Sequence, residues 1–168
     1  MSTVSPTNAH LFFVAHEGDA VEVLRLLREY PATVNMMYSR DFGIMVVRGY
    51  ALDIAAAEGH LECVKVLMDF GANQLQPEPD FGQLAIHRAA SNGHLDIVKY
   101  LLEKGAPILE PDQQGQTSLH FAAEHGRTEV CKFLLDHGAR PSLTVKYRGK
   151  TPKMWAEMGG HFDCAAVL

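Results

Sequence analysis

The chain has 168 residues, 47% of them hydrophobic and 21% charged, a balance typical of a globular protein with one ordinary core. Its formal net charge of −5 argues against general affinity for nucleic acids or anionic lipids. There is no apolar run long enough to span a membrane, and the first ten residues do not resemble a signal peptide. Three cysteines without C-x-x-C spacing are typical of reduced thiols in an intracellular protein, cytoplasmic or nuclear.

A repeated pattern runs through nearly the whole chain. Three segments align without gaps, with starts 34 and 33 residues apart, and weaker copies flank them on both sides. The units start near residues 7, 48, 82, 115 and 149. The last unit ends at Leu168, partway through its second expected helix, and we interpret it as truncated or as a terminal cap. Self-similarity at this period predicts one domain, residues 1–168, built from stacked units.

Each unit has the composition of two short helices joined by a glycine turn. In the fourth unit a short apolar helix over residues 119–124 carries two alanines, and small residues allow neighbouring helices to approach closely. Gly126 then breaks the helix and permits the backbone angles of a tight turn. Second helices carry an apolar stripe, such as Ile97, Val98 and Leu101 in the third unit. Neither helix can bury its apolar side alone, so the units must stack.

The repeated residues resemble those of the ankyrin repeat, G-x-T-P-L-H-x-A-A-x-x-G-H-L, over about residues 7–168. The motif is carried by the segments TSLH (117–120), LAIH (84–87), TP (151–152), GHL (59–61 and 93–95) and GA (71–72, 105–106 and 138–139). The resemblance implies an all-α repeat solenoid of about five stacked helix–turn–helix units with projecting β-hairpin fingers. It also implies that the histidine of the T-P-L-H segment links neighbouring units by hydrogen bonds. The second unit departs from the motif, with YALD at 50–53.

The first finger, residues 34–50, is longer than the others. Sixteen residues separate Ala32 from the next unit start, whereas the later connections take nine or ten. Its apolar composition predicts strands over residues 34–40 and 44–50, with a turn at 41–43. A projecting finger cannot hide so many apolar side chains, so we expect a contact surface for a partner. The alternative is that the finger packs against the first unit or pairs with the next finger.

Several short motifs of catalytic proteins occur without the context that their chemistry needs. DFG appears at 41–43 and 80–82, but no kinase catalytic loop accompanies it. GKT at 149–151 lacks the preceding glycine of a phosphate-binding loop. The recurring histidines follow the repeat period, which favours a structural role over metal binding. We therefore predict no catalytic residue, cofactor or metal. An enzyme would need a pocket with two or more convergent titratable groups of strongly shifted pKa.

The resemblance implies that a partner binds to the concave face, formed by the finger tips and the exposed sides of the first helices. Aromatic and arginine side chains on such a face are the best candidates for binding energy. For Phe121 and Trp155 the alternative is burial against the next helix. The candidate partner-binding residues are Met37, Tyr38, Phe42, Ile44, Val46, Glu58, Asp80, Phe81, Gln83, Arg88, Asn92, Gln113, Gln114, Phe121, Glu124, His125, Tyr147, Arg148, Lys150 and Trp155.

These features predict a non-catalytic protein–protein interaction module. Its partner would be another protein, not a nucleic acid or a membrane, and we expect the chain to be a monomer. One alternative is a self-associating scaffold protein that forms a homodimer through the finger 34–50. Another is a small ankyrin-type inhibitor of another enzyme. The size of the protein as a function of concentration distinguishes self-association from the binding of a different protein.

Overall fold

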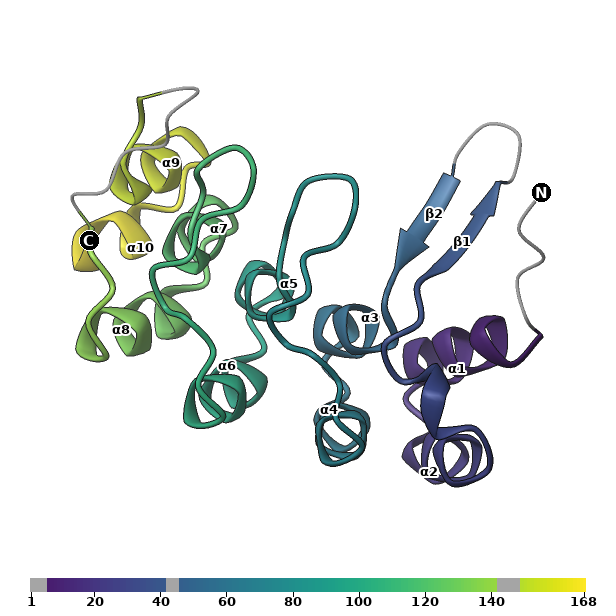
Figure 1. Cartoon of the computed structure of the whole chain (residues 1–168). Coiled ribbons are helices and arrows are strands. Elements are labelled where there is room, and N and C mark those ends of the chain that lie inside the picture. The colour runs from purple at the N-terminus through teal and green to yellow at the C-terminus, as the bar shows by residue number, and fades with distance from the viewer. Residues whose placement is uncertain (1–5, 42–45, 142–148) are drawn as a thin grey trace.

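A computed structural model describes residues 6–41, 46–141 and 149–168 (Figure 1). Within these residues ten α-helices form five consecutive pairs, and the expected all-α repeat solenoid is confirmed. The pairs are α1 (Pro6–Glu17) with α2 (Ala20–Glu29), α3 (Ala51–Glu58) with α4 (Leu61–Asp69), α5 (Ala85–Asn92) with α6 (Leu95–Glu103), α7 (Ser118–Glu124) with α8 (Thr128–Asp136), and α9 (Pro152–Met158) with α10 (Phe162–Val167).

The helices lie in two rows (Figure 1). The first helices of the pairs, α1, α3, α5, α7 and α9, lie side by side in one row, and each contacts the next. The second helices α2, α4, α6 and α8 form the other row. The described parts of the connections that follow α2, α4 and α6 extend beyond the row of first helices as fingers. We call residues 70–84 the second finger and residues 104–117 the third finger. One side of the molecule is therefore built from fingers and first helices together.

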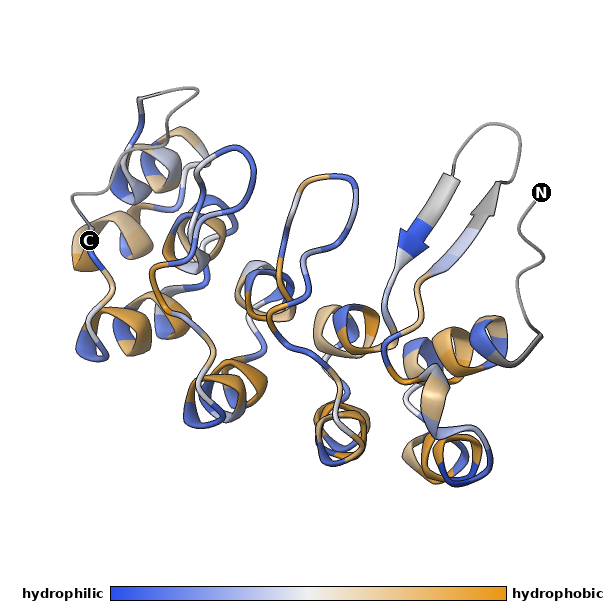
Figure 2. Cartoon of the chain, in the orientation of Figure 1, coloured by the Kyte–Doolittle hydropathy of each residue, from blue (hydrophilic) through white to orange (hydrophobic). Residues whose placement is uncertain are grey.

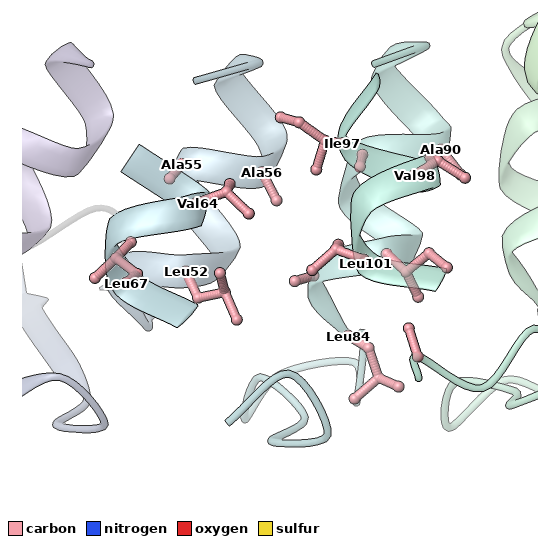
Figure 3. Packing of buried hydrophobic residues seen from close by; sticks show 14 of the residues in the cluster. Leu52, Ala55, Ala56, Val64, Leu67, Leu84, Ala90, Ile97, Val98 and Leu101 are labelled. Atoms are coloured by element: carbon pink, nitrogen blue, oxygen red, sulfur yellow. The ribbon is translucent and has the colours of Figure 1, made fainter. Parts of the chain in front are cut away.

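The core is a continuous layer between the two rows. Paired alanines such as Ala55 and Ala56 are fully buried, and their small size lets adjacent first helices approach closely. Larger aliphatic side chains of the second helices, including Val64, Ile97 and Leu101, fill the space beneath them (Figure 3). Figure 2 shows hydrophobic and hydrophilic residues on different sides of the second helices α2, α4, α6 and α8, as expected for amphipathic helices packed on one side.

A row of imidazole rings joins successive units at their central glycines. The Nε2 atom of His94 lies 2.9 Å from the carbonyl oxygen of Ala57 in the preceding unit, and His60 makes the same contact to His16 at 3.0 Å. In the fourth unit Arg127 takes this place, and its Nε–H donates to the Ser91 carbonyl oxygen at 2.9 Å. The predicted structural role of His60 and His94 is confirmed.

The first finger forms a two-stranded antiparallel sheet, β1 (Tyr38–Asp41) with β2 (Val46–Gly49). The predicted first strand, residues 34–40, begins too early, and the predicted second strand, residues 44–50, extends one residue past the end of β2. Residues 44–45 lie outside the described residues. The chain first makes a short 3-10 helix, η1 (Pro31–Thr33), Val34 keeps helical angles, and the Met36 N–H donates to the Thr33 carbonyl oxygen. Pairing therefore starts only at Tyr38, opposite Gly49. Asp41, expected in the turn, is paired with Val46 at the end of β1.

Tyr38 anchors the base of the first finger on the first unit. Its ring stacks on Phe12 with a centroid distance of 4.5 Å, and it meets the edge of Phe13 at 5.4 Å. Only 1% of Tyr38 is exposed. The expectation that Tyr38 offers its side chain to a partner is therefore wrong. The base of the finger follows the alternative, in which the finger packs against the first unit.

Candidate functional site

The tips of the second and third fingers present an exposed surface held by backbone hydrogen bonds. Phe81 is 52% exposed, and Asp80, Gln113 and Gln114 around it are exposed as well. The Gln113 N–H donates to the Phe81 carbonyl oxygen at 3.0 Å, which ties the two fingers together. The backbone of this exposed aromatic residue is therefore held in place by the neighbouring finger.

In each of these two fingers a buried carboxylate accepts hydrogen bonds from backbone N–H groups of the same finger. Glu78 is only 7% exposed, and its carboxylate accepts backbone N–H groups from Asp80, Phe81 and Gln83 at 2.7, 2.7 and 3.2 Å. Asp112 does the same in the third finger, where its Oδ1 accepts the N–H groups of Gln114 and Gln116 at 2.8 Å.

Glu78, the longer of the two acidic side chains, lies in the finger with the longer loop. The carboxylate of Glu78 reaches a residue five positions on, whereas that of Asp112 reaches one four positions on, so the additional methylene of glutamate spans the additional residue. The sequence prediction did not include Glu78 or Asp112. The available signal was an acidic residue at the same place in two fingers, a residue type that often accepts nearby backbone N–H groups in turns.

The second unit differs from its neighbours where Asp53 replaces the histidine of the motif. In the third unit the ring of His87 accepts the N–H of Leu84 at Nδ1 (3.1 Å) and donates from Nε2 to the Glu110 carbonyl oxygen of the next finger (2.9 Å). The predicted linking role of this histidine is confirmed. Asp53 keeps only the first of these bonds, from the Tyr50 N–H at 3.4 Å. A carboxylate has no N–H with which to reach the second finger.

A cavity of about 230 Å³ lies beside Asp53, between the first two fingers and the first helices. Burial raises the pKa of Asp53 to about 7, against the opposing effects of the Tyr50 N–H and the Arg88 charge. At the mouth of the cavity Arg48 pairs with Asp80 at 3.6 Å. The cavity is lined by Phe12, Arg48, Gly49, Tyr50, Asp53, Ile54, Glu78, Asp80, Phe81 and Arg88. Sequence reasoning identified the departure at 50–53 but did not predict a cavity there.

A second, more open depression of about 580 Å³ lies between the second and third fingers. Its walls are mainly apolar and include Leu75, Leu84 and three prolines, Pro77, Pro107 and Pro111. It is the larger of the two hollows. The smaller one brings together the charged side chains and the exposed aromatic residue of the predicted concave face.

The remaining candidates fall into five groups. Met37, Glu58, Asn92 and His125 are exposed, and Gln83, Arg88, Glu124 and Lys150 are half-buried. Phe121 and Trp155 are only 6% and 8% exposed, so the alternative of burial holds for both. The Phe121 ring packs 5.5 Å from the ring of His87, and the Lys150 ammonium lies 5.2 Å above Trp155. Val46 contributes its backbone to β2. Phe42, Ile44, Tyr147 and Arg148 lie outside the described residues.

Cys63, Cys131 and Cys164 are free thiols, and all three are buried. The structure adds a contact that sequence reasoning missed, because the Sγ atoms of Cys131 and Cys164 lie 3.2 Å apart between α8 and α10. Their separation of 33 residues, one repeat period, was the available signal. Burial and the neighbouring thiol raise the pKa of Cys131.

The described residues contain neither a metal-binding cluster nor a membrane-spanning helix. No three His, Cys, Asp or Glu side chains in the described ranges are grouped so that they could hold a metal ion. None of the helices in the same part of the chain combines the length and the apolar character needed to cross a bilayer.

Comparison with known proteins gives one family match. A family model described as ankyrin repeats matches three overlapping stretches, residues 11–112, 52–145 and 107–168. Together these stretches run from α1 to the last residue given. A search of curated proteins returned no match.

Proposed function

The chain belongs to the ankyrin-repeat family, and from this premise we propose that it is a non-catalytic module that binds a partner protein through its concave face and first finger. Ankyrin repeats are generally protein–protein interaction modules. The proposed face combines the tips of the second and third fingers with the exposed sides of α3, α5 and α7.

The observation that carries this proposal is that Phe81 combines an exposed side chain with a backbone held by hydrogen bonds. Its side chain is half exposed, while its N–H is held by the Glu78 carboxylate and its carbonyl oxygen by the Gln113 N–H. Binding usually costs entropy because loops and side chains must be ordered, and here the loop is already ordered. Aromatic anchors of this kind contribute a large share of the energy at protein interfaces.

The first finger adds exposed apolar side chains to the proposed interface. Met36 and Met37 are 45% and 41% exposed, just before β1 begins, and Tyr38 fixes the chain beneath them. Methionine side chains are unbranched and polarisable, so they adapt to partner surfaces of different shapes. The proposed interface therefore combines adaptable methionine side chains with one aromatic side chain, Phe81, whose backbone is held in place.

The non-catalytic part of the proposal is supported by the surroundings of Asp53. Glu78 uses its carboxylate on three backbone N–H groups, and Asp80 pairs with Arg48. Neither neighbouring acid is thus free to exchange protons with a substrate together with Asp53. General acid–base catalysis needs such a partner within hydrogen-bond reach.

The test is a comparison of two exposed phenylalanines. The full chain is immobilised, partners are captured from lysate and identified, and the affinity for the purified partner is measured by calorimetry. Phe81→Ala should weaken binding by about thirtyfold, the size of an interface hot spot. Phe162→Ala, which removes a 72% exposed ring from α10, is the matched control and should change affinity less than about threefold. Equal effects of the two substitutions would place the interface elsewhere.

Self-association is checked on the same samples. The mass of the wild-type protein is measured by sedimentation over a hundredfold range of concentration. A monomer at all concentrations supports binding to a different protein. A dimer that dissociates when Met36 and Met37 are changed to serine would instead support the scaffold alternative through the first finger.

A further inference from the structure

We propose that the cavity between the first two fingers receives a cationic side chain of the partner, an arginine or a lysine, with Asp53 as its carboxylate acceptor. This inference rests on the proposed function, because it names the chemical group of the partner that enters the concave face. The cavity is about 230 Å³, smaller than the pockets that take drug-sized ligands, and it suits a single side chain.

The residue that lines the cavity at this point is the aspartate that stands in place of the histidine of the motif. At the same place in the third unit, the His87 ring fills the gap to the next finger and donates to the Glu110 carbonyl oxygen. The shorter side chain of Asp53 does not bridge that gap. Between the second unit and the second finger the structure instead has a contact of Gln76 Nε2 with the Tyr50 hydroxyl at 3.2 Å.

Asp53 is a buried carboxylate with few hydrogen bonds. It is 6% exposed, and among the described residues the single hydrogen bond to it is the 3.4 Å contact from the Tyr50 N–H. An ionised carboxylate offers about four acceptor positions, and burial makes unused ones costly. A guanidinium or ammonium group supplies several N–H donors together with the opposite charge.

The charges that line the cavity favour a cation over an anion. Arg48 and Arg88 face Asp53, Glu78 and Asp80, so two positive charges meet three negative ones when Asp53 is ionised. A cationic side chain would bring the sum to zero, whereas an anion would leave it at minus two. The rings of Phe12 and Phe81 also line the cavity, and aromatic faces attract cations.

The protonation of Asp53 predicts a second property of the site, which is that its affinity for a cation depends on pH. Because burial raises the pKa of Asp53 to about 7, the carboxyl group is mostly neutral at pH 5.5 and mostly ionised at pH 8. The groups that face it are Arg48 and Tyr50 of the first finger, Glu78 and Asp80 of the second, and Arg88 of α5, while α1 contributes the uncharged Phe12. A ligand that needs the ionised form should bind about thirtyfold more tightly at pH 8 than at pH 5.5.

The test uses small probes and the full chain. Nα-acetyl-arginine methylamide is titrated against protein with ¹³C-labelled methyl groups, and the neutral citrulline and anionic aspartate analogues serve as comparisons. Ile54, which lines the cavity, is the reporter, because its methyl signals do not exchange with water at pH 8. We expect the arginine probe to shift the Ile54 signal saturably and more tightly at pH 8, and the other two probes to bind at least about tenfold more weakly.

Three variants sharpen the result. Asp53→Asn keeps the size but removes the charge, and it should abolish the preference for arginine and its pH dependence. Asp53→His restores the ring found in the third unit and should also abolish arginine binding while the fold is kept. Asp136→Asn, at an exposed position of α8, should bind the probe as the wild type does. Equal binding of arginine and citrulline, tighter binding of the anionic probe, or unchanged binding by Asp53→Asn would overturn the inference.

Failure of this inference can be told apart from failure of the proposed function. If Phe81→Ala weakens the partner complex but the arginine probe leaves the Ile54 signal unshifted, the proposed interface is supported and the cation site is contradicted. If the probe binds as expected but Phe81→Ala leaves the affinity for the partner unchanged, the cation site is supported and the proposed interface is contradicted.

Discussion

The ring of His94 occupies the space that a side chain on Gly59 would need. A β-carbon built on Gly59 would lie 2.5 Å from Cε1 of His94, closer than real β-carbons approach other atoms. Gly59 also has a φ of +85°, which side chains disfavour. The glycine is thus required both by its own turn and by the ring of the next unit.

Replacement of this glycine should cost more stability than the turn alone explains. Gly59→Ala combines backbone strain with displacement of His94, and we expect a loss of roughly 2–4 kcal/mol. Gly71→Ala is the matched control, since Gly71 has the same φ of +85° but no atom within 4 Å of a β-carbon, and it should lose about 1–2 kcal/mol. Urea unfolding measures both, and equal losses would rule out the contribution of the ring.

Asp53 should make the protein less stable as the pH rises. Its pKa of about 7 in the folded chain lies above that of an unfolded aspartate, so the folded state binds more protons between about pH 4 and pH 7. The stability due to the neutral carboxyl group is complete below this range and declines through it, by up to roughly 4 kcal/mol at pH 8. Asp53→Asn removes this decline, so the free energy of unfolding of the variant should increase relative to that of the wild type as the pH rises.

Urea unfolding at pH 5, 6, 7 and 8 checks this expectation. Burial lowers the pKa of His87, so its own contribution is lost as the pH falls, in the wild type and the variant alike. The difference between the two proteins therefore isolates Asp53. Parallel stability curves would show that the pKa of Asp53 is not raised.

Tyr38 should act through its ring and not through its hydroxyl group. The hydroxyl is buried and has no hydrogen-bond partner in the described part of the chain. Tyr38→Phe should therefore be neutral or stabilising by up to about 1 kcal/mol, whereas Tyr38→Ala should lose about 3 kcal/mol or more with the stacking on Phe12. Thermal unfolding separates the two outcomes. A marked loss from Tyr38→Phe would contradict the packing described here.

Glu78 should control the order of the second finger. Glu78→Ala removes the acceptor of three N–H groups, so hydrogen exchange at Asp80, Phe81 and Gln83 should become at least about tenfold faster. Exchange within α3 should stay unchanged. Glu103→Ala, at an exposed position in α6, is the control and should leave the finger protected. Unchanged protection in Glu78→Ala would show that the loop is held by other contacts.

The thiols should be unreactive in the folded chain. Burial raises the pKa of Cys63 to about 11 and raises that of Cys131, and the thiolate is the form that reacts. Labelling with a thiol-specific disulfide reagent at pH 7.5 should therefore follow the rate of unfolding, and all three thiols should react at once in denaturant. Fast labelling of the folded protein would indicate that the second row of helices opens.

The repeat period was enough to predict the stack of helix pairs. The same residues recur at the same points of each unit, such as the central glycines and the paired alanines, and stacking is the way in which such units bury their apolar sides. The linking role of His87 followed from the family resemblance and is confirmed. The structural role of His94 followed from the repeat period and is confirmed as well.

Contacts outside the repeat period could not be predicted in this way. The burial of Tyr38 depends on how the base of the first finger meets Phe12 and Phe13, and the periodic pattern does not determine that contact. The cavity beside Asp53 is lined by residues from three units, and the periodic pattern does not determine the volume that they leave between them. Phe121 and Trp155 repeat regularly, but whether such a position is covered depends on the neighbouring unit.

The carboxylates of Glu78 and Asp112 hold the fingers through backbone N–H groups. The side chains at 80, 81, 113 and 114 take no part in those hydrogen bonds, so they can mutate while the scaffold beneath them persists. In the proposed interface, a few point substitutions in such loops would exchange one binding partner for another. Natural selection would then act on recognition at these four positions while the architecture beneath them stays the same.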